Sequence, residues 1–254
     1  MSEAPETLEG WWIWHDFRRV DLDVWDRLGA GGREAALQSL GARIRAFEAK
    51  NARRESSFGL YQLAGHKADL LFMHLRPSLA DLVALKAELL PEPFFRIHPP
   101  VYSYISVVEL SRYVAHGNPD PATNPALRER LYPSLPETTY VCFYPMSKRR
   151  QGDDNWYMLP REERVRMMRG HGGIGHQYHE RVTQIISGSQ GLDDWEWGVT
   201  LYADDAIDFK KLVYEMRFDE ASARFAEFGP FYVGRRIGFD SLSAWLLGSV
   251  TDAR

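Results

Sequence analysis

Thr139-Tyr-Val-Cys-Phe-Tyr144-Pro-Met146-Ser-Lys148-Arg-Arg150 and Gly170-His171-Gly-Gly-Ile-Gly175-His176 are the two pieces of sequence around which the fold is organised. The first is rich in aromatic and β-branched residues, which predicts a strand. Side chains alternate between the two faces of a strand, so we expect Tyr144, Met146 and Lys148 on one face, and Phe143 and Ser147 on the other. A phenol, a thioether and a cation would then line one wall.

The second piece lies in a pattern that predicts a helix over residues 159–181. Its apolar stripe is expected at Val165, Met168, Gly172, Gly175, Tyr178 and Val182, with His171 beside it. Glycines surround this histidine, and each costs roughly 1 kcal/mol relative to alanine inside a helix. A planar macrocycle held by the imidazole would explain their presence. An ordinary histidine beside a helix break is the alternative, and spacing alone leaves both interpretations open.

Composition narrows the function classes. The chain has 254 residues and a formal net charge of -4, enough for one large or two ordinary domains and too acidic for nucleic acid to be the main partner. The single cysteine, Cys142, excludes an internal disulfide and is expected to be a buried, inert thiol. Because no apolar run approaches a membrane span and the acidic start is unlike a signal peptide, we expect a soluble cytoplasmic protein.

The predicted elements repeat the order strand, helix, hairpin, helix, strand. The first copy has strands at 10–20, 58–63, 69–75 and 101–113, with helices at 31–49 and 79–90 and a short helical turn at 21–28. The second copy has strands at 138–147, 182–188, 194–203 and 224–235, with helices at 159–181 and 204–217. We interpret the pair as two ferredoxin-like β-α-β-β-α-β units with antiparallel sheets, an α+β fold.

A segment rich in proline separates the two copies. Prolines at 119, 121, 125, 133 and 136 predict an interdomain linker over residues 116–137. The expected domains are therefore 1–115 and 138–254.

One polar side chain stands out in the strand that starts at residue 182. Gln184 shares a face with Val182 and Ile186. A buried amide without a partner costs about 1 to 3 kcal/mol, so Gln184 indicates a ligand or an ordered water, unless this face is solvated. A ligand site in the second unit would lie between its sheet, with Tyr144, and its first helix, with His171.

Long ordered matches give the chain a resemblance to a known family. They are Tyr144-Pro-Met-Ser-Lys-Arg-Arg150, Asp154-Asn-Trp-Tyr-Met158, Arg169-Gly-His-Gly-Gly-Ile-Gly175, Gly191-Leu-Asp-Asp-Trp-Glu-Trp-Gly-Val199 and Tyr214-Glu-Met-Arg-Phe-Asp-Glu-Ala-Ser-Ala223. The chain resembles the chlorite dismutase-like superfamily and, within it, the coproheme decarboxylases. The resemblance implies two ferredoxin-like domains per subunit, haem in the C-terminal one, and a homopentamer.

The resemblance also implies a role for each candidate site residue. His171 would be the axial ligand to the haem iron, and Tyr144 the catalytic tyrosine. Lys148 would orient a reacting propionate. Further substrate contacts are implied at Arg130, Met146 and Ser222, and Trp195 would pack at the haem edge or in the core. Considered alone, Tyr144 would be a core tyrosine, and Arg130 and Ser222 would be surface or capping residues.

Three polar positions bear on the branch of the superfamily. Gln184 matches the distal residue of the decarboxylase branch, whereas true chlorite dismutases place an arginine there, so chlorite turnover is not expected. The role of His176 stays open; with His179 it could chelate a metal at one helical turn, although no further ligand is evident. His116, in the linker, is not expected in the pocket.

The activity implied by the resemblance is hydrogen-peroxide-dependent decarboxylation of two propionates of iron coproporphyrin III (coproheme), giving haem b through a three-propionate intermediate. Coproheme would be both substrate and redox cofactor, supplied by a coproporphyrin ferrochelatase through transient contact. Two alternatives stay open. One is a haem peroxidase or chlorite dismutase-like enzyme, and the other is a non-enzymatic haem carrier or sensor.

Overall fold

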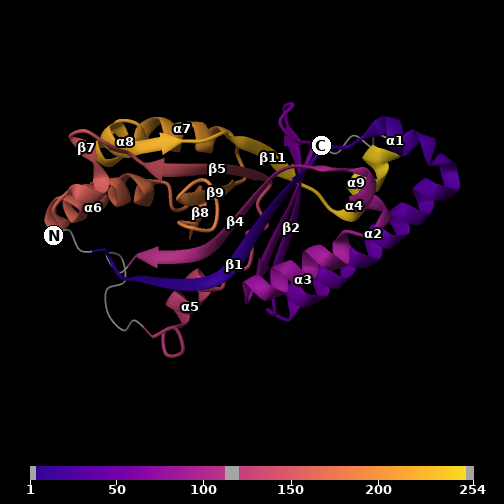
Figure 1. Ribbon diagram of the computed structural model, residues 1–254, viewed down its shortest axis with the longest axis horizontal. Helices are drawn as coiled ribbons and strands as arrows, with labels where there is room; N and C mark the ends of the chain where they lie inside the picture. The colour runs from indigo at the N-terminus through magenta and orange to yellow at the C-terminus, as the bar shows by residue number, and fades with distance from the viewer. Residues whose placement is uncertain (1–3, 112–119, 250–254) are drawn as a thin grey trace. The chain divides into compact units, whose positions relative to one another are not determined.

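The computed structural model describes residues 4–111 and 120–249 (Figure 1). Helices and antiparallel strands make up the fold, which confirms the expected α+β class. The chain divides into two compact units. We call Ile105–Val233 with Met1–Gly10 the C-terminal unit, and Trp11–Tyr104 with Gly234–Arg254 the N-terminal unit. The domain boundaries 1–115, 116–137 and 138–254 stay a prediction.

The N-terminal unit has a sheet in the order β2-β3-β1-β4. Its strands are β1 (Thr7–Arg18), β2 (Ser57–Ala64), β3 (Leu70–Arg76) and the start of β4 (Pro100–Ser111); its helices are α1 (Leu22–Arg27), α2 (Gly29–Ala52), α3 (Leu79–Leu89), α4 (Pro93–Ile97) and α9 (Phe239–Leu246). Apolar residues spaced three or four apart along α2 are buried: Leu37, Leu40, Ile44 and Phe47. The sequence did not predict α4, because Pro93 occupies its first turn, where proline is tolerated.

The C-terminal unit repeats this arrangement with the order β8-β9-β5-β10. Its larger elements are β5 (Tyr140–Lys148), α6 (Arg161–Gln177), β8 (Thr183–Gly188), β9 (Trp197–Ala203), α7 (Ile207–Met216), β10 (Ala226–Phe228) and the start of β11 (Tyr232–Arg236) (Figure 1). A small hairpin, β6 (Arg150–Gln151) with β7 (Asp154–Asn155), and the turn η1 (Trp156–Met158) follow β5.

Two segments differ from the sequence prediction. Residues 224–235 are not one strand: α8 (Glu220–Phe225) reaches into them, and β10 and β11 follow, separated by Gly229 and Pro230. Gly229 lies outside both strands and donates its amide to the carbonyl of Pro145. The expected linker contains α5 (Pro125–Leu131), whose N-terminus is capped by the Asn124 side chain. His116 lies outside the described residues. Within the described part of the chain, no helix is both long and apolar enough to cross a membrane.

Candidate functional site

One face of the C-terminal sheet collects the side chains singled out in the sequence. Residues opposite one another in antiparallel strands share a face, and alternate residues along a strand share it too. Tyr144 lies opposite Val199, which in turn lies opposite Ile186. By this register the face carries, from three strands, Tyr144, Met146, Lys148, Gln184, Ile186, Trp197, Val199 and Leu201. The alternation predicted for β5 is therefore present.

Tyr144 is buried among aromatic rings on this face. Its ring stacks on Phe231 at a centroid distance of 4.5 Å and lies 5.7 Å from Phe228. Burial, with a smaller effect of nearby Cys142, raises the pKa of the phenol above its usual value. The hydroxyl therefore keeps its hydrogen at neutral pH.

Lys148 is a buried cation at the end of the same face. Its Nζ lies 4.6 Å from the centroid of the Trp156 ring and donates to the carbonyl oxygen of Ala221 at 3.4 Å. Burial lowers the pKa of this ammonium to about 8, although Asp219 and Glu196 act in the opposite direction. Among the described residues no carboxylate forms an ion pair with Nζ, so a substrate carboxylate brought there would supply a close counter-charge.

Helix α6 carries His171, and its packed stripe differs from the prediction by one residue. Arg164 and Met167 are buried, so the first half of the stripe runs one position earlier than expected and includes the half-buried His171, whereas Tyr178 and Val182 are buried as predicted. The cause is α8, because Met167 packs in a cluster with Ala221, Phe225 and Trp156.

The glycines of α6 border space that the protein does not fill. A Cβ on Gly175 would lie 3.4 Å from Met216 Cε and 3.6 Å from Gln184 Nε2, so this side of the helix is directed at the sheet face. Gly172 lies one turn earlier on the same side, yet a Cβ there would meet nothing within 4 Å. Ile186, on the facing sheet, is 44% exposed. The space next to Gly172 is therefore open, on the side of α6 that Gly175 directs at the sheet.

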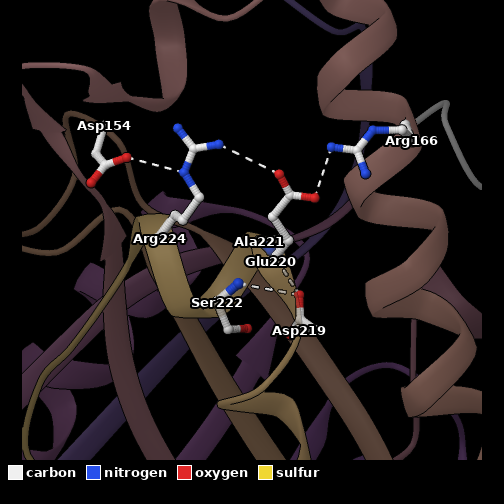
Figure 2. A network of polar contacts seen from close by, with 7 residues as sticks. All are labelled: Asp154, Arg166, Asp219, Glu220, Ala221, Ser222 and Arg224. Carbon is white, nitrogen blue, oxygen red and sulfur yellow. Dashed lines mark hydrogen bonds and ion pairs between the residues drawn. The ribbon is translucent and has the colours of Figure 1, made fainter.

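His171 is held through one ring nitrogen by a carboxylate that sequence reasoning missed. Its Nδ1 lies 3.0 Å from Asp219 Oδ2, while Asp219 Oδ1 accepts the amides of Ala221 at 2.9 Å and Ser222 at 3.2 Å (Figure 2). Burial alone would raise the pKa of Asp219, but the hydrogen bonds from His171 and Ser222 hold it below its usual value. An ionised Asp219 makes Nδ1 the donor and leaves Nε2 with its lone pair for a ligand.

The remaining predicted residues are placed differently. Ser222 Oγ lies 3.4 Å from His171 Nδ1, so it belongs to the same group of side chains. Arg130 is exposed on α5, and no contact in the described part of the chain brings it to the others. Trp195 lies beside Gly229 and Pro145, and Pro145 points to the face opposite Tyr144. Trp197 lies opposite Met146, on the same face as Tyr144. The sequence analysis did not select Trp197 as a site residue, although it lies two residues after Trp195 in the same motif.

His176 and His179, the pair considered for metal chelation, lie close together at the end of α6. The rings of His176 and His179 stack at 4.6 Å, and His179 Nδ1 bonds to the carbonyl of His176. In the ranges 4–111 and 120–249, no group of three or more His, Cys, Asp or Glu residues is arranged to hold a metal ion.

Comparison with known proteins places the chain in a family. The chlorite dismutase family matches residues 33–237, most of the chain. A haem-binding protein from Thermus thermophilus is 48% identical over 97% of this chain and 98% of its own, with a TM-score of 0.92. A chlorite dismutase from Candidatus Nitrospira defluvii shares the fold at 20% identity, covering 94% of this chain and 95% of its own, with a TM-score of 0.74. The chain belongs to the chlorite dismutase family and has its fold of two ferredoxin-like domains.

Proposed function

We propose that the chain binds coproheme and, with hydrogen peroxide as oxidant, decarboxylates two of its propionates to vinyl groups, giving haem b. The observation that carries this is the pairing of His171 with Asp219 beside an unfilled, glycine-lined space. A histidine whose Nδ1 is fixed by a carboxylate presents Nε2 to a metal, the usual arrangement of metal-binding histidines.

The open space suits a flat, largely apolar ligand. On one side is a helix surface without side chains at Gly172, and on the other the partly exposed Ile186 with Met146 and Trp197. Glycine permits close approach of a planar group to the backbone. The haem-binding relative from Thermus thermophilus supports an iron porphyrin as this ligand.

The substrate's carboxylates need cations and donors at the rim of such a site. Lys148 provides a buried ammonium, and Ser222 a hydroxyl near His171; Arg130 remains a proposed contact. The bound iron porphyrin supplies the redox chemistry and is consumed as substrate. Each decarboxylation converts one propionate, one peroxide and one proton into one vinyl group, carbon dioxide and two waters. Tyr144 holds its phenolic hydrogen on the substrate side of the sheet and is the group we propose to give up and regain it.

Gln184 favours the decarboxylase over chlorite turnover, because its neutral amide cannot supply the positive charge that an arginine would place there. We further propose a cytoplasmic homopentamer that receives coproheme from a coproporphyrin ferrochelatase by transient contact.

The test is a titration of the coproheme-loaded protein with hydrogen peroxide, with porphyrin masses read by chromatography and mass spectrometry. We expect stepwise loss of two carboxyl groups through a three-propionate intermediate. Tyr144→Phe should bind coproheme and lose this reaction, whereas Tyr140→Phe, on the same strand and face, should retain it. Tight binding with no mass change in the wild type would instead identify a carrier or sensor, and generic peroxidation without decarboxylation would identify a peroxidase.

A further inference from the structure

One short helix contacts both ends of the candidate site. α8 has 6 residues, too few to be stable alone. Its cap residue Asp219 bonds to His171, and its Ala221 carbonyl accepts from Lys148. Any displacement of α8 therefore moves the partners of both side chains together.

Part of what holds α8 is apolar packing. Ala221 and Phe225 lie in a buried cluster with Trp156, from the turn after the β6–β7 hairpin, and Met167 of α6. Hydrophobic burial is non-directional, so directional polar contacts can further restrict the rotation of the helix and its position along its axis.

A chain of ion pairs ties α8 to both neighbours. Glu220 accepts from Arg166 of α6 at 2.7 Å and from Arg224, in its own helix, at 3.4 Å. Arg224 also donates to Asp154 of the hairpin at 3.1 Å (Figure 2). The hydrogen bond from Arg166 lowers the pKa of Glu220, so the chain is charged at neutral pH. Figure 2 shows Glu220 between the guanidinium groups of Arg224 and Arg166, and the Asp219 carboxylate directed at the amides of Ala221 and Ser222 at the start of the same helix.

We propose that Glu220 and Arg224 are positioning residues, which fix α8 between α6 and the β6–β7 hairpin and so keep His171 and Lys148 in register for one bound substrate. The ion-pair geometry stands independently of the reaction, while the consequence for catalysis rests on the proposed function. Because these side chains are partly exposed, their effect should weaken as salt screens them.

The first experiment uses the apoprotein and does not depend on activity. Exchange of the Ala221 and Ser222 amides, which donate to Asp219, reports local opening of α8. Glu220→Gln should accelerate this exchange about threefold, the size expected of partly exposed pairs. High salt should also accelerate this exchange in the wild type, and it should have little further effect on the exchange in Glu220→Gln. Arg166→Gln separates the ion pairs from the effect of a negative charge at the helix N-terminus, because it leaves Glu220 charged.

The second experiment uses the ferrous, porphyrin-loaded protein. We expect the iron–histidine stretching band to broaden and shift in Glu220→Gln and to be restored in Glu220→Asp, which keeps the charge. Arg53→Gln, which breaks an exposed pair with Glu55 elsewhere, is the matched control and should change neither readout.

Unchanged exchange at Ala221 and Ser222 in both Glu220→Gln and Arg166→Gln would overturn the positioning role. If Glu220→Gln also accelerates amide exchange throughout β9, the result for Arg166→Gln decides between the two explanations. Faster exchange confined to α8 in Arg166→Gln supports the positioning role. Faster exchange throughout the unit, or no change, refutes it. Failure of decarboxylation with the α8 effects intact would refute only the proposed function.

Discussion

Asp219 connects helix α8 to His171 of helix α6, which is far from it in sequence. One carboxylate oxygen of Asp219 caps α8, and the other lies 3.0 Å from the imidazole of His171. Asp219→Asn keeps an oxygen for the cap but removes the charge that fixes the imidazole. We expect porphyrin affinity to fall about 10- to 100-fold, the usual cost of removing such a partner, measured by titrating the apoprotein with haem and with coproheme.

Asp208→Asn is the control for this change. Asp208 lies on α7, its side chain is similarly buried, and it pairs with Arg181 at 2.8 Å. An equal loss of affinity in both variants would mean that general loosening, and not the bond to His171, is responsible.

Filling the glycine-lined space should separate folding from binding. Gly172→Leu places a side chain in the space in front of α6 while removing a helix-destabilising glycine. We expect an apoprotein that melts at the same or a higher temperature and no longer binds porphyrin. Gly170→Leu, which gains the same propensity at an exposed position on the nearly opposite side of the helix, should still bind. Retained binding in Gly172→Leu would place the ligand elsewhere.

Lys148 should lower the stability of the apoprotein in the absence of ligand. Its pKa is lowered from 10.5 to about 8, so the unfolded chain binds the proton more tightly and folding at pH 7 is opposed by about 3 kcal/mol. This penalty is fully present below pH 8 and disappears as the pH rises through 10.5. Lys148→Met should therefore stabilise the apoprotein at pH 7 by about 1–3 kcal/mol in urea unfolding, with weaker coproheme binding. A less stable variant would contradict this.

Acid should destabilise the N-terminal unit through its buried histidines. Burial lowers the pKa of His98 from 6.5 to about 4, with Arg18 contributing and Asp21 and Asp69 opposing. The unfolded state takes up the proton first, so stability is complete above pH 6.5 and falls by about 2–3 kcal/mol as the pH approaches 4.

His98→Asn should flatten this acid dependence, because an asparagine oxygen can still accept the Asp21 amide that His98 Nδ1 accepts but does not titrate. Urea midpoints at pH 7 and pH 5 give the comparison. The exposed His66→Asn is the control and should keep the wild-type difference.

The features predictable from sequence were those with a period. The alternation of β5 placed Tyr144, Met146 and Lys148 together, and the helix predicted over residues 31–49 is present within α2. The bond between His171 and Asp219 joins residues 48 positions apart, and such a contact produces no periodic pattern in the sequence. Asp219 could therefore be predicted only as a helix cap and not as the partner of His171. α8 is shorter than the window over which a helical pattern can be recognised, and residues 224–235 were consequently mistaken for a strand.

The shared face of Tyr144, Met146 and Lys148 has a consequence for how the chain can change in length. Inserting or deleting one residue in β5 ahead of Tyr144 would turn the phenol, the thioether and the ammonium to the other face together, because the side-chain period of a strand is two. Inserting or deleting two residues would keep the three side chains on the same face. Each would then lie opposite the next β9 residue of that face. Gain or loss of a single codon there is therefore tolerable only with a compensating bulge, whereas the loop between β9 and α7 has no such parity to keep.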